Sequence, residues 1–131
     1  MNPSERTVVI EQLPESCAGN ASRELLQRLR AQIDELVRPA VVLDCSRVKQ
    51  SDKQVVHLLF SCLEEALKRN GDVRLAAVRP DAWPALQAAG VGRLFRIFPS
   101  HAEAASSYRK SSAYSYTAAP AGASQSAANA A

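Results

Sequence analysis

Residues 41–60, with the sequence VVLDCSRVKQSDKQVVHLLF, constrain the fold more than any other part of the chain. A short apolar run stops at Asp44, and a polar, basic loop follows before Ser51 and Asp52 open a long helix-patterned segment. A strand that is apolar at every position is typical of a sheet covered on both faces. Where such a strand leads to a helix N-terminus, free backbone N–H groups and a partial positive charge are presented. This place can hold an anion or a phosphoryl group, or show a surface to a partner.

The rest of the chain alternates short apolar runs with segments of helical period. Strands are predicted at residues 7–12, 41–43, 73–77 and 95–98, and helices from Asn20 or Ser22 to residue 37, at 51–69, at 81–89 and at 100–108. Because alternating strands and helices indicate an α/β sandwich, we expect about four to five strands in a mostly parallel or mixed sheet, with about four helices.

The two long helices are predicted from their apolar faces. The first would bury Leu25, Leu26, Leu29, Ile33, Leu36 and Val37, and it would end before Pro39 because a residue preceding proline avoids helical geometry. The second would bury Val55, Leu58, Leu59, Cys62, Leu63 and Ala66, with Glu64, Glu65, Lys68 and Arg69 outside the stripe or in the last turn. Amphipathic helices of this kind are predicted to pack against the sheet.

Several polar residues and glycines mark the helix ends. Ser51 with Gln54 and Ser100 with Glu103 fit capping boxes, and Asp81 is predicted to cap the third helix. Asn70-Gly71 and Gly90 are predicted to end the second and third helices.

Composition sets the class of the protein. The 131 residues are 47% hydrophobic and 5% aromatic, so the core must be aliphatic. The net charge is +3, and the Lys and Arg residues are scattered among acidic residues without aromatic residues between them. We therefore expect no nucleic-acid partner. No signal-like or membrane-spanning run is present in the sequence, and an odd number of cysteines without CxxC spacing favours a reducing compartment. The expectation is a soluble protein of the bacterial cytoplasm, without direct membrane insertion.

The folded part is predicted to end near residue 108. Residues 109–131 are rich in Ser and Ala and lack an apolar period, so they cannot bury enough surface to offset their ordering entropy. We expect a single domain over residues 1–108 and a disordered tail over residues 109–131.

Catalytic and metal chemistry have little support in the sequence. Ser46, His57 and Asp44 form a triad only on paper, because no nucleophile elbow accompanies them. Asp44 is better explained as a hydrogen-bond acceptor that shapes its loop than as a phospho-aspartate. His57 lacks neighbours at metal-ligand spacing, and the cysteines are best explained as small buried apolar residues. We expect no enzyme activity, no cofactor and no metal.

Three stretches of the chain together carry a family pattern: VVLDCSRVKQSDKQVVHLLFSCLEEALKRNG, VRLAAVRPDAWPALQAAGVGRLFRIFPSHAEAA and LPESCAGNASRELLQRL. Together they resemble the STAS domain, the fold of the anti-sigma factor antagonists. The first resembles that family's strand, its Asp-Ser-Ser-Gly or Asp-Ser-Ala-Gly loop and its long helix. The second resembles the closing half, and the third lies where the family has its first long helix. The resemblance covers about residues 7–108 and implies a STAS-like α/β sandwich. The first edge strand of that fold would be missing here or formed by residues 2–6.

The resemblance implies a phosphorylation switch whose acceptor is altered in this chain. Family members bind an anti-sigma factor that is also a serine kinase, and phosphorylation of the Ser or Thr after the loop Asp breaks the complex. Asp52 matches that Asp, but the acceptor position is Lys53, which cannot take a phosphoryl group by that chemistry. Ser51 is expected to be an N-cap, and a shifted phosphosite there is the alternative.

The expected function is therefore protein recognition through the loop and the start of the long helix. The partner-binding loop is predicted to comprise Arg47, Lys49, Ser51, Asp52, Lys53 and Gln54. A solvated Lys53 in a degenerate loop is the plainer alternative to a basic docking surface. The predicted partner is an anti-sigma factor or a serine kinase-like regulator, and a homodimer is compatible with the sequence. A STAS adaptor subunit of a transporter or stress-signalling complex, and a small anion or nucleotide sensor, are the alternative functions.

Overall fold

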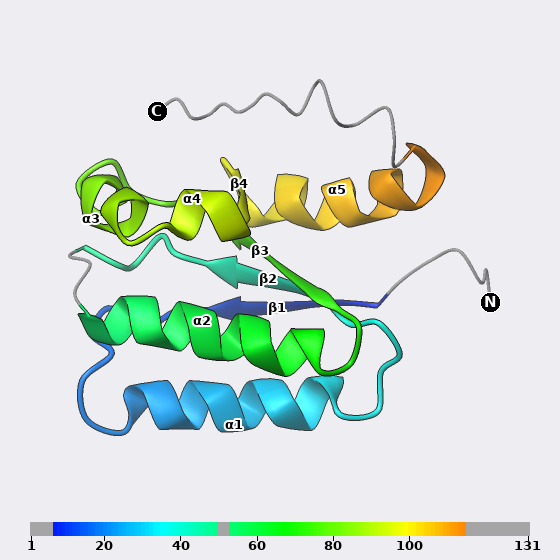
Figure 1. Ribbon diagram of the computed structural model, residues 1–131, viewed down its shortest axis with the longest axis horizontal. Helices are drawn as coiled ribbons and strands as arrows, with labels where there is room; N and C mark the ends of the chain where they lie inside the picture. Colours follow the sequence, from blue (N-terminus) through cyan, green and yellow to red (C-terminus); the bar gives the residue numbers. More distant parts are fainter. Residues whose placement is uncertain (1–6, 50–52, 115–131) are drawn as a thin grey trace.

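The structure is an α/β sandwich built on one parallel sheet (Figure 1). The computed structural model describes residues 7–49 and 53–114, and within these ranges the chain forms four strands and five helices. In chain order they are β1 (Val8–Gln12), α1 (Ala21–Ile33), β2 (Ala40–Asp44), α2 (Lys53–Leu67), β3 (Asp72–Ala76), α3 (Trp83–Ala88), α4 (Val91–Leu94), β4 (Arg96–Phe98) and α5 (His101–Tyr114). The strands pair in the order β1-β2-β3-β4, all parallel. The α/β class and the parallel sheet expected from the sequence are confirmed.

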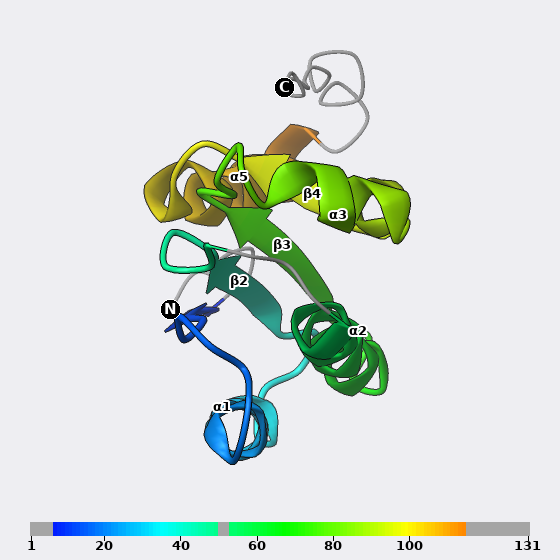
Figure 2. The same cartoon turned by 90° about the vertical axis from the view of Figure 1, so that its left-hand side faces the viewer.

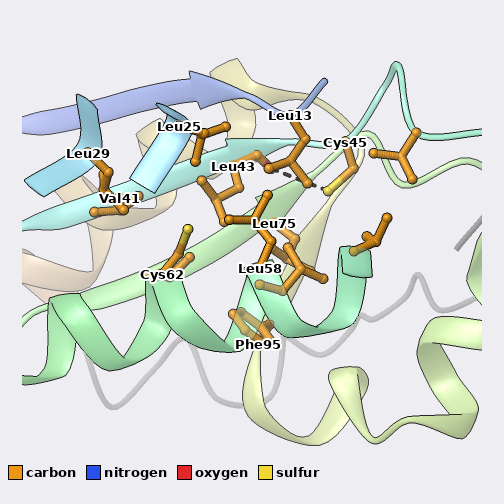
Figure 3. Packing of buried hydrophobic residues seen from close by; sticks show 14 of the residues in the cluster. Leu13, Leu25, Leu29, Val41, Leu43, Cys45, Leu58, Cys62, Leu75 and Phe95 are labelled. Atoms are coloured by element: carbon orange, nitrogen blue, oxygen red, sulfur yellow. Dashed lines mark hydrogen bonds between the residues drawn. The ribbon is translucent and has the colours of Figure 1, made fainter. Parts of the chain in front are cut away.

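Helices cover both faces of the sheet, and the faces have different cores. Figure 2 shows α1 and α2 together on one face and α5 on the other. Every residue of β2 is buried, with Val41 and Leu43 in the larger cluster beneath α1 and α2, and Val42 in the smaller cluster beneath α5. Figure 3 shows the larger cluster, where side chains of α1 and α2 meet those of β2 and β3. The uninterrupted apolar run at the start of residues 41–60 is thus explained by burial on both faces.

The first helix is shorter than predicted. Leu25, Leu29 and Ile33 are fully buried, but α1 ends at Ile33, and Val37 is 88% exposed beyond the helix. The prediction that Val37 belongs to the buried face is therefore wrong. The connection to β2 passes through Arg38, which has a positive φ of 54° and whose N–H donates to the Arg69 carbonyl at 3.2 Å. The helix was predicted to be too long because the apolar spacing continues to Val37, and this spacing does not show where the backbone turns toward β2.

The second helix packs as predicted except at one acidic position. Val55, Leu58, Leu59, Cys62 and Ala66 are buried, and Leu63 is partly buried. Glu65, predicted to lie outside the stripe, is only 6% exposed. Its carboxylate meets Arg30 of α1 at 3.1 Å, Arg69 at 3.3 Å and Lys68 at 3.4 Å. A buried carboxylate is tolerated because these three cations compensate its lost hydration.

The Glu65 cluster predicts a loss of stability in acid. Burial alone would raise the pKa of Glu65, but hydrogen bonds from Arg30 and Arg69, with Lys68 nearby, hold that pKa below its usual value of 4.5. The ionised Glu65 carboxylate therefore stabilises the fold fully at pH values above its usual pKa, which applies to the unfolded chain. This stabilisation is lost as the pH falls through the lowered pKa of Glu65 in the folded protein. Urea unfolding of wild type and Glu65→Gln across acidic pH should show their stability difference shrinking with acid. A difference that stays constant across that range would contradict this assignment.

The end of α2 depends on the absence of a side chain at Gly71. Asn70 adopts the left-handed conformation with φ of 61°, and the Gly71 N–H donates to the Ala66 carbonyl at 2.8 Å, so the predicted C-cap is confirmed. A Cβ at Gly71 would overlap the Pro39 carbonyl oxygen and lie 2.7 Å from Pro39 Cγ. The glycine therefore allows the end of α2 to meet the start of β2.

Replacing Gly71 by alanine should therefore be costly. Gly71→Ala is expected to lower the free energy of unfolding by about 2–3 kcal/mol, because the clash is with backbone that cannot rotate away. The control is Gly19→Ala, where φ is 65° and a Cβ would meet nothing within 4 Å, so only backbone strain is added. Denaturant unfolding of both variants gives the comparison. An equal or smaller loss for Gly71→Ala would show that the Pro39 contact relaxes freely.

The C-terminal half differs from the predicted elements at three points. Asp81 does not cap α3: its carboxylate binds Arg79 at 3.1 Å, and the N-cap position is Ala82. The one-turn helix α4 was not predicted, because its four residues are too few to show a period. The last helix extends to Tyr114 rather than to about residue 108. The capping box is confirmed, since the Glu103 N–H donates to Ser100 Oγ at 3.2 Å. Residues 2–6, where the family's first edge strand would lie if it is present, and residues 115–131 of the predicted tail lie outside the described residues.

Candidate functional site

The loop after β2 is held in place by Asp44 and by a buried valine. Asp44 Oδ1 accepts a hydrogen bond from the Ser46 N–H at 2.8 Å, as expected for a side chain that shapes its loop. The Cys45 N–H donates to the Ala76 carbonyl of β3 at 2.8 Å, and the Val48 N–H donates to the Cys45 carbonyl at 3.0 Å. Val48 is 1% exposed. The first half of the loop is therefore anchored to the core.

The two basic residues of this half face solvent on either side of Val48. Arg47 and Lys49 are exposed, and Lys49 Nζ lies 3.0 Å from Glu15 Oε2. The hydrogen bond and charge of Lys49, with a smaller contribution from Arg47, hold the pKa of Glu15 below its usual value. An exposed pair of this kind adds little stability, but it partly neutralises Lys49. Arg47 is thus the stronger source of positive charge in the described part of the loop.

Four of the six predicted site residues lie in the described part of the structure. Lys53 and Gln54 are exposed in the first turn of α2, close in sequence to the anchored half of the loop that carries Arg47 and Lys49. Ser51 and Asp52 lie outside the described residues. The capping box of Ser51 with Gln54, the loop role of Asp52 and the shifted phosphosite at Ser51 therefore stay predictions.

Two hollows flank the first turns of α2. One, of about 440 Å³, lies toward α1 and is lined by Cys17, Ser22, Lys53, Gln54 and His57. The other, of about 600 Å³, lies toward α3 and is lined by Lys53, Val56, His57, Phe60, Ala85, Ala88 and Ala89. Lys53 and His57 border both hollows, and no salt bridge joins either side chain to a residue in the described ranges. The start of α2 is therefore a ridge between two depressions, and it carries the positive charge of Lys53.

Most of the residues around this ridge were not among the predicted site residues. His57 was considered only as a metal ligand or a triad member, and it is exposed beside Lys53. The spacing of Lys53, Val56, His57 and Phe60 at i, i+3, i+4 and i+7 places these residues on one side of the helix and was visible in the sequence. The alanines of α3 carried no such signal, because only the tertiary fold brings them beside α2.

The three cysteines are buried, and none of them forms a disulfide within the described residues. Burial raises the pKa of both Cys45 and Cys62 to about 12. The Cys45 and Cys62 thiols therefore stay protonated at neutral pH and are poor nucleophiles. This environment matches their prediction as small buried apolar residues.

The described residues contain neither a metal-binding cluster nor a membrane-spanning helix. No group of three or more His, Cys, Asp or Glu side chains there could hold a metal ion. In the same part of the chain, no helix combines the length and the apolarity that crossing a membrane requires.

Comparisons with known proteins match the fold. A family model described as "STAS domain" matches residues 5–104. A STAS domain protein from Planctomyces limnophilus, described as an anti-sigma-factor antagonist, superposes with a TM-score of 0.63 at 15% identity, covering 82% of this chain and 94% of that one. A sulfate transporter family protein from Wolinella succinogenes superposes with a TM-score of 0.59 at 23% identity, covering 81% of this chain and 87% of that one. No curated protein matches this chain.

Proposed function

The chain belongs to the STAS domain family, and on that premise we propose that it is a non-enzymatic interaction domain that binds a regulatory protein. The proposed binding surface, called here the α2 surface, comprises the loop of residues 47–54 and the exposed side of α2. Its described members include Arg47, Lys49, Lys53 and Gln54, all of which face solvent. The proposed partner is an anti-sigma factor or a serine kinase-like regulator in the bacterial cytoplasm.

The observation that carries the proposal is an exposed lysine as the first residue of α2. Lys53 stands where the resemblance places a phosphorylated Ser or Thr, and its amine lacks the hydroxyl oxygen that accepts a phosphoryl group. Phosphorylation would add about −1.5 to −2 charges at a helix N-terminus. Lys53 keeps a positive charge there instead. We infer that binding at the α2 surface is constitutive, or that it is regulated by a different route.

A second candidate is an adaptor subunit of a transporter or a stress-signalling complex. The same fold occurs in the Wolinella protein described as a member of the sulfate transporter family. At 23% identity this likeness concerns the fold alone. An adaptor needs a permanent docking surface without a switch, which a non-phosphorylatable Lys53 would provide. Purification under native conditions distinguishes the two, since an adaptor would co-purify with transporter or signalling subunits at fixed stoichiometry.

The absence of the usual switch can be tested directly. The complex with its partner is incubated with the cognate serine kinase and ATP, and both phosphate incorporation and partner release are followed. We expect the loop to stay unmodified and the complex to persist. Lys53→Ser is the companion variant, and it should gain phosphate at residue 53 and release the partner. Stoichiometric modification of the wild-type loop, at Ser51 for example, with release of the partner would overturn the proposal.

A further inference from the structure

The larger hollow at the start of α2 is a groove between two helices. Its α2 wall consists of Lys53, Val56, His57 and Phe60, and its α3 wall of Ala85, Ala88 and Ala89. Figure 2 shows α2 and α3 as neighbours at the end of the molecule where α2 begins. The volume of about 600 Å³ is open to solvent on a surface that the proposed function already uses.

The walls of this groove match the shape of a helix. Residues 53, 56, 57 and 60 share one side of α2 because they follow the helical period. Residues 85 and 88 share one side of α3 in the same way, and Ala89 is the C-cap of that helix. The α2 wall spans about 10 Å, or two turns. The three alanines are exposed and present only methyl groups, so a third helix can approach the α3 backbone closely.

The apolar part of the groove is fixed in position by the core. Phe60 is partly buried and its ring lies 5.9 Å from that of Phe95, which is 4% exposed. Val56 is also partly buried against the main cluster. An apolar side chain that docks against Phe60 and Val56 would therefore meet a surface that is already ordered, which lowers the entropy lost on binding.

Lys53 supplies the positive charge of the groove, and no carboxylate lines it. His57 adds an imidazole ring to the same wall. The first turn of α2 in the described residues also lacks an acidic side chain that would neutralise Lys53. An occupant with acidic groups opposite Lys53 and His57 would be complementary to this wall.

We propose that this groove binds an acidic amphipathic helix of the protein partner. Apolar side chains of that helix, spaced i, i+3, i+4 and i+7, lie against Val56, Phe60 and the alanines of α3, and its Asp or Glu side chains face Lys53 and His57. The inference rests on the proposed function, and it adds the kind of segment that the α2 surface recognises.

A pair of synthetic peptides tests the chemistry of the groove. The acidic peptide is a helix of about 15 residues with a leucine stripe flanked by glutamates, and the basic peptide carries lysine at each glutamate position. Each is titrated into the full-length ¹⁵N-labelled protein, and backbone amide shifts are recorded. We expect saturable shifts on both walls of the groove, with the acidic peptide binding at least about tenfold more tightly. Equal affinities, shifts centred elsewhere, or no saturation at millimolar peptide would overturn the inference.

A groove-filling variant provides the structural control. Ala88→Gln places a longer side chain in the groove from an exposed helical position, so the fold should persist while affinity for the acidic peptide falls by about tenfold. Ala102→Gln makes the same change at an exposed position of α5, on the other face of the sheet, and should leave that affinity unchanged. Equal effects of the two substitutions would contradict the proposal.

Measuring the affinity of the native partner for the variants shows whether the groove assignment or the proposed function fails. If Lys53→Glu weakens partner binding and Ala88→Gln does not, the α2 surface stands and the groove assignment fails. If neither substitution weakens it, the α2 surface is not the binding site and both proposals fail. Loss of affinity in both variants, with Ala102→Gln unaffected, supports both.

Discussion

Tyr108→Ala is expected to lower the free energy of unfolding by about 3–5 kcal/mol, because it removes the largest side chain of the core beneath α5. Tyr108 is completely buried, and its hydroxyl donates to the Val41 carbonyl of β2 at 2.9 Å. Arg74 of β3 lies over its ring, 4.0 Å from the centroid. The other buried members of this small cluster are Ala40, Val42, Ala76, Ala104 and Ala105. These small side chains cannot fill the space that an alanine at position 108 would leave.

Tyr108→Phe separates packing from hydrogen bonding. It keeps the ring and the Arg74 contact but removes the hydroxyl, so it should cost about 1 kcal/mol. Urea unfolding of both variants, followed by circular dichroism, measures the two losses. If Tyr108→Ala cost no more than Tyr108→Phe, the ring would contribute little, and α5 would be held by contacts other than this cluster.

Lys53→Glu is expected to weaken partner binding by about 100-fold, equivalent to about 2.7 kcal/mol, because an attraction is replaced by repulsion from a like charge. The Lys53 side chain is exposed and borders both hollows at the start of α2. Isothermal titration with the partner isolated from the native host gives the affinity. The same substitution should leave the fold intact, because a carboxylate in the first turn of a helix is favourable.

Arg109→Glu is the matched control for this prediction. It changes the net charge by the same amount at an exposed position of α5, which covers the opposite face of the sheet. Its effect on affinity should be small and should vanish at high salt. Equal losses for Lys53→Glu and Arg109→Glu would mean that the partner senses net charge rather than the α2 surface.

Local patterns in the sequence were sufficient for the main elements of the fold. The unbroken apolar run of β2 and the helical stripe of α2 each depend on residues close together in the chain, so their period was readable. The capping box of Ser100 and Glu103 is local in the same sense. The errors concern long-range contacts. The burial of Glu65 depends on Arg30 of another helix, and the end of α1 depends on where the chain must turn toward β2.

The candidate site was predictable to a similar degree. The loop after Asp44 and the exposed Lys53 followed from the order of strand, loop and helix. The groove did not, because Ala85 and Ala88 lie about 30 residues from Lys53 in the chain and only packing through the sheet brings them near. Tyr108 shows the same limit. The sequence placed it at the end of the domain, whereas in the fold it is the centre of the second core.

Amide hydrogen exchange of the isolated protein and of its complex with the native partner locates the face that the partner covers. A partner bound at the α2 surface should slow exchange in residues 47–57, at the loop and the start of α2, and leave β1 and α5 unchanged. Slower exchange in α5 or along β1, with residues 47–57 unaffected, would contradict this binding site, because the partner would then bind a different face of the sheet.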